Sequence, residues 1–405
     1  AGFRVVEGER LVLVTDRPPR EGDGVPDLPR LFSEAFDIWC RHYGLDPAAD
    51  RDWRARGCLI VDREKFRTAG LLPPEIPEFV NGFCDRDRFW LLDQSNPAYR
   101  RHLLFHEGVH AFTHTLRNLD SHPWYTEGIA EYLATHRLEA DRQGVDHVVS
   151  TPLPARKTDV EQLGRIEQLR SLQDAGRSPS LAAVLRRAPT AHRDIAAYAA
   201  DWALVTMLAR HPAYAKPFTT EERRALDATL NDRLTTMPGW QPARAGRDYA
   251  AFLTEVDYGF DFARSAIDWS TGRRLESAAT IPVDAARGWQ NSGVSLKTGQ
   301  QSRISATGRC EVGVLPDTKL ESTADGISLR WYRGRPVGTL LAAQWVDPPN
   351  ESASGRFEIL TTGGTGTITA VVDGPLYFKI NESPGDLADN AGSLQVTLTP
   401  EAKAP

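Results

Sequence analysis

The chain has 405 residues, more than one domain of ordinary size holds, so we expect two or three domains. Hydrophobic residues make up 41% and charged residues 25%, a balance typical of a globular protein rather than a disordered or fibrous one. A formal net charge of -6 offers no basic field to phosphate backbones, which argues against nucleic acid as a partner. No apolar run approaches the roughly 18 to 20 residues that cross a bilayer, so no transmembrane segment is expected.

Two further features concern the compartment of the protein. The chain starts at Ala1 and its first methionine is Met207, which fits removal of a signal peptide. No CxxC pair occurs, so a thiolate zinc site is not predicted. One disulfide among the first three cysteines and free buried thiols are both compatible with the sequence. The cysteines are Cys40, Cys58, Cys84 and Cys310.

The N-terminal part of the chain mixes strand-like and helix-like segments. The segment FRVVEGERLVLVTD predicts a hairpin around Gly8. Apolar residues recur at helical spacing in LPRLFSEAFDIWCRHYG, and Gly44 marks the end of this helix. CLIVD and DRFWLLD predict two further strands. This pattern gives an α+β lead-in to the next helix.

Two consecutive helices are expected next. Ser95 or Asn96 can cap the first helix, which contains LLFHEGVHAF and continues through His114. After the turn DSHPW, the second helix is expected from about Tyr125 to Leu138. From about residue 160 to 265 the chain is predicted to be almost entirely helical.

The composition changes after about residue 270, where short β-rich segments alternate with glycine, serine, threonine and asparagine. Candidate strands are GVSLKTG, SRISATG, ISLRWYRG, GTLLAAQW, RFEILTTG, GTITAVV, LYFKI and SLQVTLT. So many short strands argue for a β-sandwich or jelly roll. We therefore predict a multidomain chain with these parts: an α+β domain at 1–150, a helical part at 151–268 and an all-β sandwich at 269–405.

The stretch HEGVH places His106 and His110 four residues apart on a predicted helix. Both imidazoles then lie on one face and can bind a single zinc ion. Glu107 lies about 100° around the helix from His106, so it cannot readily bind the same ion but can reach a metal-bound water. His102 and His114 extend the four-residue spacing, so HLLFH or HAFTH could also chelate a metal. We expect these two histidines to support the site or merely to pack.

The segment WYTEGIAEYLATH supplies two carboxylates one helical turn apart. Glu127 follows His110 closely and can complete a His2Glu zinc site that leaves a fourth position open for water. Glu131 lies on the same face and can accept the other N–H of a ligating histidine, which would hold its ring in place. The alternative is two solvated glutamates on an amphipathic helix.

HEGVH and TEGIAEY together resemble the gluzincin zinc metallopeptidases, which pair HExxH with a downstream glutamate; the resemblance is strongest to compact bacterial peptidase-MA-like domains. It implies a thermolysin-like α+β fold with a mostly helical second part, an extracytoplasmic bacterial location and Glu107 as general base. The zinc ligands it implies are His106, His110 and Glu127. It also implies an oxyanion-binding residue, for which Tyr198 is the first candidate and Tyr214 the weaker one. Tyr198 can equally be a core aromatic residue.

The segment GPLYFKINESPGDLADNAGSLQVTL, with the preceding RGRPVGTLLA, is similar to calcium-dependent galactose-binding lectins of the PA-IL type. The resemblance implies a calcium site and carbohydrate binding. The matching positions are Glu382, Asp386, Asp389 and Asn390, with Val312 near a position whose backbone carbonyl also binds the ion. Clustered oxygen-rich side chains suit a hard cation such as calcium. A solvated acidic loop closing a hairpin is the alternative.

The sequence thus predicts a zinc-dependent metallopeptidase that hydrolyses peptide bonds through a zinc-bound water activated by Glu107. An accessory calcium-dependent, lectin-like domain would bind carbohydrate. The strand DRFWLLD is expected to pair with an extended peptide or protein substrate. The alternative is a non-catalytic carbohydrate- or surface-binding protein with a degenerate or structural zinc site. Structural zinc sites usually have four protein ligands, and the three evident here favour the enzyme.

Overall fold

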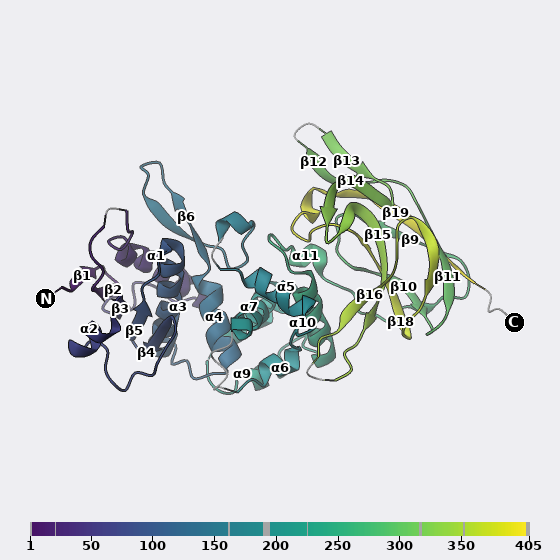
Figure 1. Ribbon diagram of the computed structural model, residues 1–405. Coiled ribbons are helices and arrows are strands. Elements are labelled where there is room, and N and C mark those ends of the chain that lie inside the picture. Colours follow the sequence, from purple (N-terminus) through teal and green to yellow (C-terminus); the bar gives the residue numbers. More distant parts are fainter. Residues whose placement is uncertain are drawn as a thin grey trace. The chain divides into compact units, whose positions relative to one another are not determined.

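The computed structural model describes residues 2–20, 22–160, 163–188, 195–224, 226–315, 318–350 and 353–401, and only the backbone of Ile195. The chain forms two compact units (Figure 1). The first unit comprises Ala1–Gln168, Leu185–Ala209 and Ala215–Pro238, and the second comprises Leu169–Val184, Arg210–Tyr214 and Gly239–Pro405. The predicted division after residues 150 and 268 stays a prediction.

A five-stranded sheet occupies the N-terminal part of the first unit. In spatial order its strands are β1 (Arg4–Glu7), β2 (Leu11–Thr15), β3 (Ala55–Ile60), β5 (Arg88–Leu92) and β4 (Gly82–Asp85). β2, β3 and β5 run parallel, while β1 and β4 are antiparallel edge strands. The predicted hairpin and the strands in CLIVD and DRFWLLD are therefore confirmed. β4 was not predicted, because its four residues are too few to show an alternating pattern.

The topology corrects the expectation for DRFWLLD. β5 pairs with β3 on one side and with β4 on the other. Both of its edges are therefore used, and the expectation that this strand pairs with an extended substrate is wrong. The edge next to it belongs to β4.

Three helices of the first unit pack on or beside this sheet. Helix α1 (Leu28–Tyr43) contacts β2 and ends at Gly44, whose φ of 70° is the left-handed conformation that glycine adopts readily. Helix α3 (Pro97–Leu116) lies across β3, β5 and β4, and contacts α1 and α4 (Pro123–Ala134). Aromatic rings fill the space between α1 and α3, as in the edge-to-face contact of Phe36 with Phe112. The predicted helix in LPRLFSEAFDIWCRHYG is confirmed.

Helix α4 is shorter than predicted. It ends at Ala134 rather than at Leu138, because Thr135 has an extended backbone. The residues that follow form β6 (His136–Ala140), which pairs with β7 (Asp146–Ser150) in a hairpin. The pairing with β7 supplies partners for backbone groups that a continued helix would otherwise satisfy.

The region predicted to be helical from about residue 160 to 265 is confirmed for the described residues. The further helices are α2 (Arg63–Thr68), α5 (Arg165–Asp174), α6 (Leu181–Leu185), α7 (Ile195–Arg210), α8 (Ala215–Glu222), α9 (Leu230–Thr236), α10 (Pro242–Glu255) and α11 (Phe262–Ser265). Short 3-10 helices are η1 (Lys157–Asp159) and η3 (Leu387–Asp389). Across the part of the chain that is described, no helix combines the length and the apolar character needed to cross a membrane.

Two six-stranded sheets build most of the second unit. The first contains β14 (Asp325–Tyr332), β15 (Arg335–Val346), β18 (Gly374–Ile380), β10 (Gln290–Leu296) and β8 (Arg273–Arg274) in this order, with β16 (Arg356–Thr362) paired to β15. The second contains β13 (Thr318–Ser322), β12 (Cys310–Leu315), β19 (Ala391–Pro400), β11 (Gln301–Thr307) and β17 (Thr365–Thr369), with β9 (Ala279–Asp284) paired to β19.

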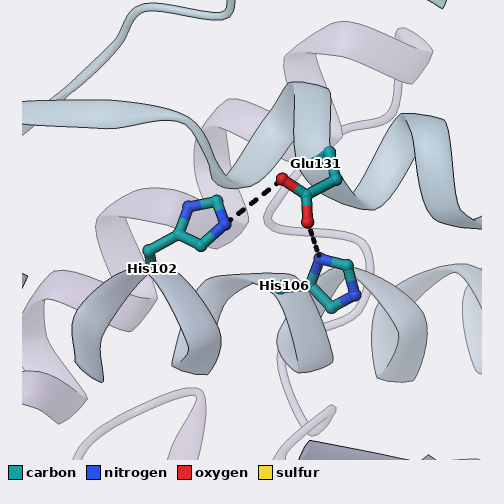
Figure 2. A group of neighbouring side chains, drawn as sticks. All are labelled: His102, His106 and Glu131. Carbon is teal, nitrogen blue, oxygen red and sulfur yellow. Dashed lines mark ion pairs between the residues drawn. The ribbon is translucent and has the colours of Figure 1, made fainter. Parts of the chain in front are cut away.

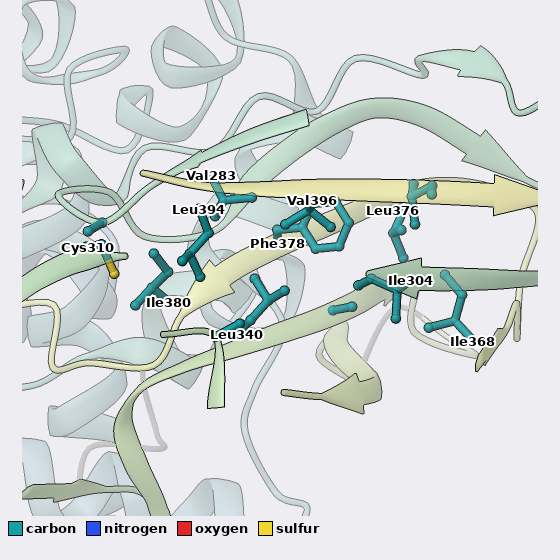
Figure 3. Packing of buried hydrophobic residues seen from close by; sticks show 14 of the residues in the cluster. Val283, Ile304, Cys310, Leu340, Ile368, Leu376, Phe378, Ile380, Leu394 and Val396 are labelled. Carbon is teal, nitrogen blue, oxygen red and sulfur yellow. The ribbon is translucent and has the colours of Figure 1, made fainter. Parts of the chain in front are cut away.

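Side chains from both sheets meet in one hydrophobic core (Figure 3). Leu340, Leu376 and Phe378 come from one sheet, and Ile304 and Val396 from the other. The β-rich region predicted after about residue 270 is confirmed, and every candidate strand is present. Strands β8, β9, β12 and β13 were missed. Their segments are short or interrupted by proline and glycine, which hides the alternation of polar and apolar residues.

The four cysteines are all free. Cys40 and Cys310 are buried, while Cys58 and Cys84 are partly exposed. The alternative of free thiols therefore holds, and the first unit is stabilised by its packed core rather than by a disulfide.

Candidate metal centre

Helix α3 carries the stretch HEGVH. Asn96 fixes the start of this helix, since its side chain accepts a hydrogen bond from the backbone N–H of Tyr99. Pro97 occupies the first turn, where its missing N–H costs nothing. One face of α3 then presents His106 and His110 one turn apart, each only 7% exposed.

Three donor atoms from α3 and α4 lie close together. The Nε2 atoms of His106 and His110 are 3.1 Å apart, and Oε2 of Glu127 lies 3.4 Å and 3.5 Å from them, respectively. Ligand atoms bound tetrahedrally to zinc at about 2.0 to 2.1 Å stand about 3.3 to 3.4 Å from one another. The spacing and the chemistry of these donors therefore fit one zinc ion.

The charges of these side chains depend on one another. Burial disfavours the charged form of His106, but the carboxylates of Glu127 and Glu131, 3.4 Å and 3.3 Å from its ring nitrogens, outweigh burial and raise its pKa to about 10. Burial also disfavours the charged form of Glu127, yet His110 and His106 together hold its pKa well below the usual range. A positive charge is thus favoured beside Glu127. A metal ion that binds here has to displace the proton of His106.

Glu107 lies against Gly82 of the sheet, and the charges of His106, His110 and Glu127 act on its carboxyl group. It is 7% exposed, and burial raises the pKa of its carboxyl group. A Cβ atom added at Gly82 of the edge strand β4 would come within 2.3 Å of Oε1 of Glu107. A buried carboxyl group with a raised pKa is suited to general-base chemistry. The neighbouring edge strand offers a place for an extended chain.

A second carboxylate, Glu131 of α4, lies between His102 and His106 (Figure 2). Oε1 of Glu131 is 3.3 Å from Nδ1 of His106, and Oε2 is 3.4 Å from Nε2 of His102. The guanidinium group of Arg165 donates to both oxygens, from Nε to Oε2 at 2.9 Å and from Nη2 to Oε1 at 2.6 Å. Nδ1 of His106 is buried and makes no hydrogen bond within the described chain. Glu131, 3.3 Å away, is the carboxylate placed to accept its N–H after a small movement and to orient the ring.

Tyr198 of α7 lies beside the histidines, with its ring centroid 6.2 Å from that of His106. Helix α7 approaches α4 closely because residue 128 is a glycine: a Cβ atom at Gly128 would lie 2.5 Å from the backbone oxygen of Asp201. Burial raises the pKa of Tyr198, so its hydroxyl group keeps its proton and can donate a hydrogen bond.

The other candidates from the sequence take different positions. His102 is buried, and burial lowers its pKa. The ring of His114 stacks on that of His110 with centroids 5.9 Å apart, and burial lowers the pKa of His114 to about 4. Tyr214 belongs to the second unit, where its hydroxyl group donates to Asp248 at 2.5 Å.

Arg165 and Gly82 were not predicted as part of this site. Arg165 is 34 positions after Glu131 and starts a polar helix without a motif. Gly82 lies in NGFCD, a short strand whose neighbour β5 was recognised. Both residues reach the site through tertiary packing, which local sequence patterns do not report. In the sequence, the glycine in NGFCD was the one feature that pointed to a close contact at this position.

Two of the predicted calcium ligands, Glu382 and Asp386, pair with Arg330 in the second unit. Nη2 of Arg330 lies 3.4 Å from Oε1 of Glu382 and 3.3 Å from Oδ2 of Asp386. Asn390 donates from Nδ2 to Oε2 of Glu382 at 3.2 Å. Burial raises the pKa of Glu382 to about 7. Asp389 lies in η3, within the same loop.

Two buried oxygens in this loop, Oε1 of Glu382 and Oδ1 of Asn390, make no hydrogen bond within the described chain. Val312 of β12 is fully buried. Among the residues that the structure describes, two groups have donors close enough for one ion: His106 with His110 and Glu127, and His102 with His106 and Glu131. Neither group includes the loop at 382–390, and calcium binding there stays a prediction.

Comparison with known proteins adds little. No protein-family model and no curated protein matches the chain. One similar solved structure is described as "EclA N-terminal domain; PllA-like lectin". It is 20% identical, covers 31% of this chain and 96% of its own length, and has a TM-score of 0.20. A likeness this weak does not discriminate between functions.

Proposed function

We propose that the chain is a zinc-dependent metallopeptidase of the gluzincin type, with a thermolysin-like active-site region. The observation that carries the proposal is the spacing of Nε2 of His106, Nε2 of His110 and Oε2 of Glu127, at 3.1, 3.4 and 3.5 Å. Three protein ligands leave a fourth position open, as catalytic zinc sites require. Glu107 does not belong to this group of donors, but their charges act on its carboxyl group, which supports its assignment as a separate base.

When bound, zinc supplies a Lewis acid that polarises a carbonyl group and lowers the pKa of a water molecule. The proton transfers belong to Glu107. Its carboxylate accepts a proton from the attacking water while the bond between the water oxygen and the scissile carbonyl carbon forms. It then donates this proton to the leaving nitrogen as the C–N bond breaks, so that the products are a carboxylic acid and an amine.

Two further parts of the chain complete this proposal. Tyr198 keeps its hydroxyl proton and donates it in a hydrogen bond to the oxyanion that develops on the scissile carbonyl oxygen. The edge strand β4 binds the substrate in an extended conformation by backbone pairing. The contact of Gly82 with Glu107 supports this role, because it sets the base beside the strand that would hold the peptide.

The proposal is tested by Glu107→Gln. The variant keeps the three donors, so it should retain zinc, as measured by mass spectrometry. It lacks the base, so cleavage of a library of quenched fluorescent peptides should fall by roughly 10^2- to 10^4-fold. Glu139→Gln on β6 is the control, because its side chain is 52% exposed and lies outside the site. Undiminished cleavage by Glu107→Gln would contradict the role of the base. A zinc-loaded wild type that cleaves no peptide would favour the non-catalytic alternative.

The second unit motivates a second proposal, a jelly-roll-like region that binds carbohydrate with the help of calcium. The observation in its favour is that Oδ1 of Asn390 is buried without a hydrogen bond, and that the buried Oε1 of Glu382 has an ion pair with Arg330 at 3.4 Å but no hydrogen bond. A calcium ion held by these oxygens together with Asp386 and Asp389 would take the place of the guanidinium group of Arg330, whose side chain is 39% exposed and can move into solvent.

Calorimetric titration with calcium chloride tests this second proposal. The wild type should bind calcium, and Asp386→Asn should bind it more weakly because one ligand charge is removed. Asp373→Asn is the control, since this aspartate is 58% exposed in a different loop. Retention on galactose-coated beads, with and without calcium, reports on carbohydrate. A wild type that binds no calcium would contradict the proposal.

A further inference from the structure

Glu131 holds together a network of buried charged and polar groups in the first unit. It is 2% exposed, yet its two oxygens face His102 and His106 (Figure 2). The same oxygens also face Arg165. A buried carboxylate is costly unless opposite charge and hydrogen bonds satisfy it. The contacts of Arg165, at 2.9 Å and 2.6 Å, are the shortest of these and engage one oxygen each.

The geometry of Arg165 fixes the direction of the Glu131 carboxylate. A guanidinium group that donates two N–H bonds to the two oxygens of one carboxylate forms a planar fork, which defines orientation as well as distance. Gln168 accepts a third hydrogen bond, from Nη1 of Arg165 at 3.0 Å, and so steadies the guanidinium group. With its orientation fixed in this way, Glu131 directs Oε1 toward Nδ1 of His106 at 3.3 Å.

We propose that Arg165 is a positioning residue that sets the zinc affinity of the site by holding Glu131 against Nδ1 of His106. This inference rests on the proposed zinc site. An imidazole that donates Nδ1–H to a carboxylate has its ring orientation fixed and its Nε2 made more basic, and outer partners of this kind change metal affinity by roughly 10- to 100-fold. The guanidinium group also faces Tyr198, with Cζ 5.8 Å from the ring centroid. Arg165 therefore contacts both Glu131, which lies against His106, and the ring of Tyr198.

The same network is not a second zinc site, although His102, His106 and Glu131 lie close enough to share an ion. Both oxygens of Glu131 already accept hydrogen bonds from Arg165. A zinc ion at this place would stand next to a fixed guanidinium charge and would compete with it for the same carboxylate. The network is therefore assigned to the support of the ligand His106.

The test compares Arg165→Met with Arg187→Met. Arg187 is a matched control, because its side chain is 15% exposed, like that of Arg165, and it pairs with a buried carboxylate, that of Asp201. The zinc dissociation constant is measured by competition with a chromogenic chelator. Arg165→Met should bind zinc roughly 10- to 100-fold more weakly than the wild type, whereas Arg187→Met should remain within about threefold. The visible absorption spectrum of the cobalt-substituted protein should change only in Arg165→Met.

A double-mutant cycle separates positioning from a general structural effect. In a Glu131→Gln background, Arg165→Met should weaken zinc binding by no more than about twofold further, because Arg165 acts through the carboxylate. Arg165→Lys keeps the charge without the fork and should give an intermediate affinity; it also replaces Arg165→Met if that variant fails to fold.

Equal zinc affinity of Arg165→Met and the wild type would overturn the positioning role, and so would full additivity with Glu131→Gln. If the wild type binds zinc tightly and Arg165→Met binds it equally well, the positioning role is wrong but the proposed zinc site stands. A wild type that binds no zinc would overturn the proposed function and this inference with it.

Discussion

Gly82 of the edge strand β4 lies directly against the carboxyl group of Glu107, so that a Cβ atom at Gly82 would come within 2.3 Å of Oε1. This contact joins the proposed base to the strand proposed to hold the substrate. Gly82→Ala should therefore displace either the carboxyl group or β4. Because small misplacements of a reacting group are costly, we expect kcat/KM on a cleaved peptide to fall by roughly 10^2-fold, with the zinc content unchanged.

The control for this prediction is Gly246→Ala in α10. Apart from its chain neighbours and the backbone of its own helix, no described atom lies within 4 Å of a Cβ atom at Gly246, so the added methyl group meets no obstacle. Alanine should instead stabilise the helix by about 0.5 to 1 kcal/mol. Equal kcat/KM for Gly82→Ala and Gly246→Ala would contradict the proposed arrangement of β4 and Glu107.

A second prediction separates the two tyrosines considered for the oxyanion. Tyr198→Phe should lower kcat by roughly 10^2- to 10^3-fold with little change in KM or zinc content, because the lost hydrogen bond forms only as charge develops. Tyr214→Phe should leave kcat unchanged, although it removes the buried hydrogen bond to Asp248 and should cost about 1 to 3 kcal/mol of stability. Steady-state kinetics and thermal unfolding of both variants check these outcomes. A normal kcat for Tyr198→Phe would remove it from the mechanism.

The third prediction concerns protons. Without metal, the neighbouring carboxylates of Glu127 and Glu131 overcome burial and raise the pKa of His106 to about 10, so this ring is protonated at pH 7. Zinc binding should release about one proton, and zinc affinity should fall roughly tenfold for each pH unit of acidification. Calorimetry at pH 7 in buffers of different ionisation enthalpy measures the released proton. A binding enthalpy that is the same in all buffers would contradict this coupling.

Local sequence patterns carried the information on which residues of α3 and α4 lie together. The four-residue spacing of His106 and His110 places both side chains on one face of a helix. Glu127, also named from the sequence, lies 3.4 Å from His106. Arg165 and Gly82 could not be predicted in the same way, because the contacts of Arg165 with Glu131 and of Gly82 with Glu107 depend on how distant elements pack.

The fold likewise contains elements that local patterns predicted and elements that depend on long-range pairing. The periodicity of LPRLFSEAFDIWCRHYG predicted α1 because its apolar residues form a continuous stripe. The extension of α4 to Leu138 was wrong, because pairing with β7 decides the conformation from His136 onward. The role of β5 was also wrong, since strand order is set by long-range pairing rather than by the composition of a strand.

A fourth prediction concerns Glu382. Burial raises its pKa from 4.5 to about 7 in the folded chain, so the protonated form contributes stability that is complete below about pH 4.5 and is lost as the pH rises through 7. Glu382→Gln keeps a neutral side chain. In the presence of EDTA, the wild type should therefore lose about 1 to 3 kcal/mol relative to Glu382→Gln between pH 4.5 and 8.

Thermal unfolding at both pH values measures this difference, with the 43% exposed Glu358→Gln as the control. Calcium should restore the wild type at pH 8, because it favours the carboxylate, and should have no such effect on Glu382→Gln. A pH-independent difference between the two proteins would contradict the buried neutral form of Glu382.

The most direct test of the central claim is the metal content of the purified protein by mass spectrometry, for the wild type, Glu127→Ala and the exposed control Glu139→Ala. We predict about one zinc per chain in the wild type and in Glu139→Ala, and a loss or strong weakening of zinc binding in Glu127→Ala. A wild type without zinc after reconstitution, or a Glu127→Ala variant that binds zinc as well as the wild type, would contradict a site built from His106, His110 and Glu127.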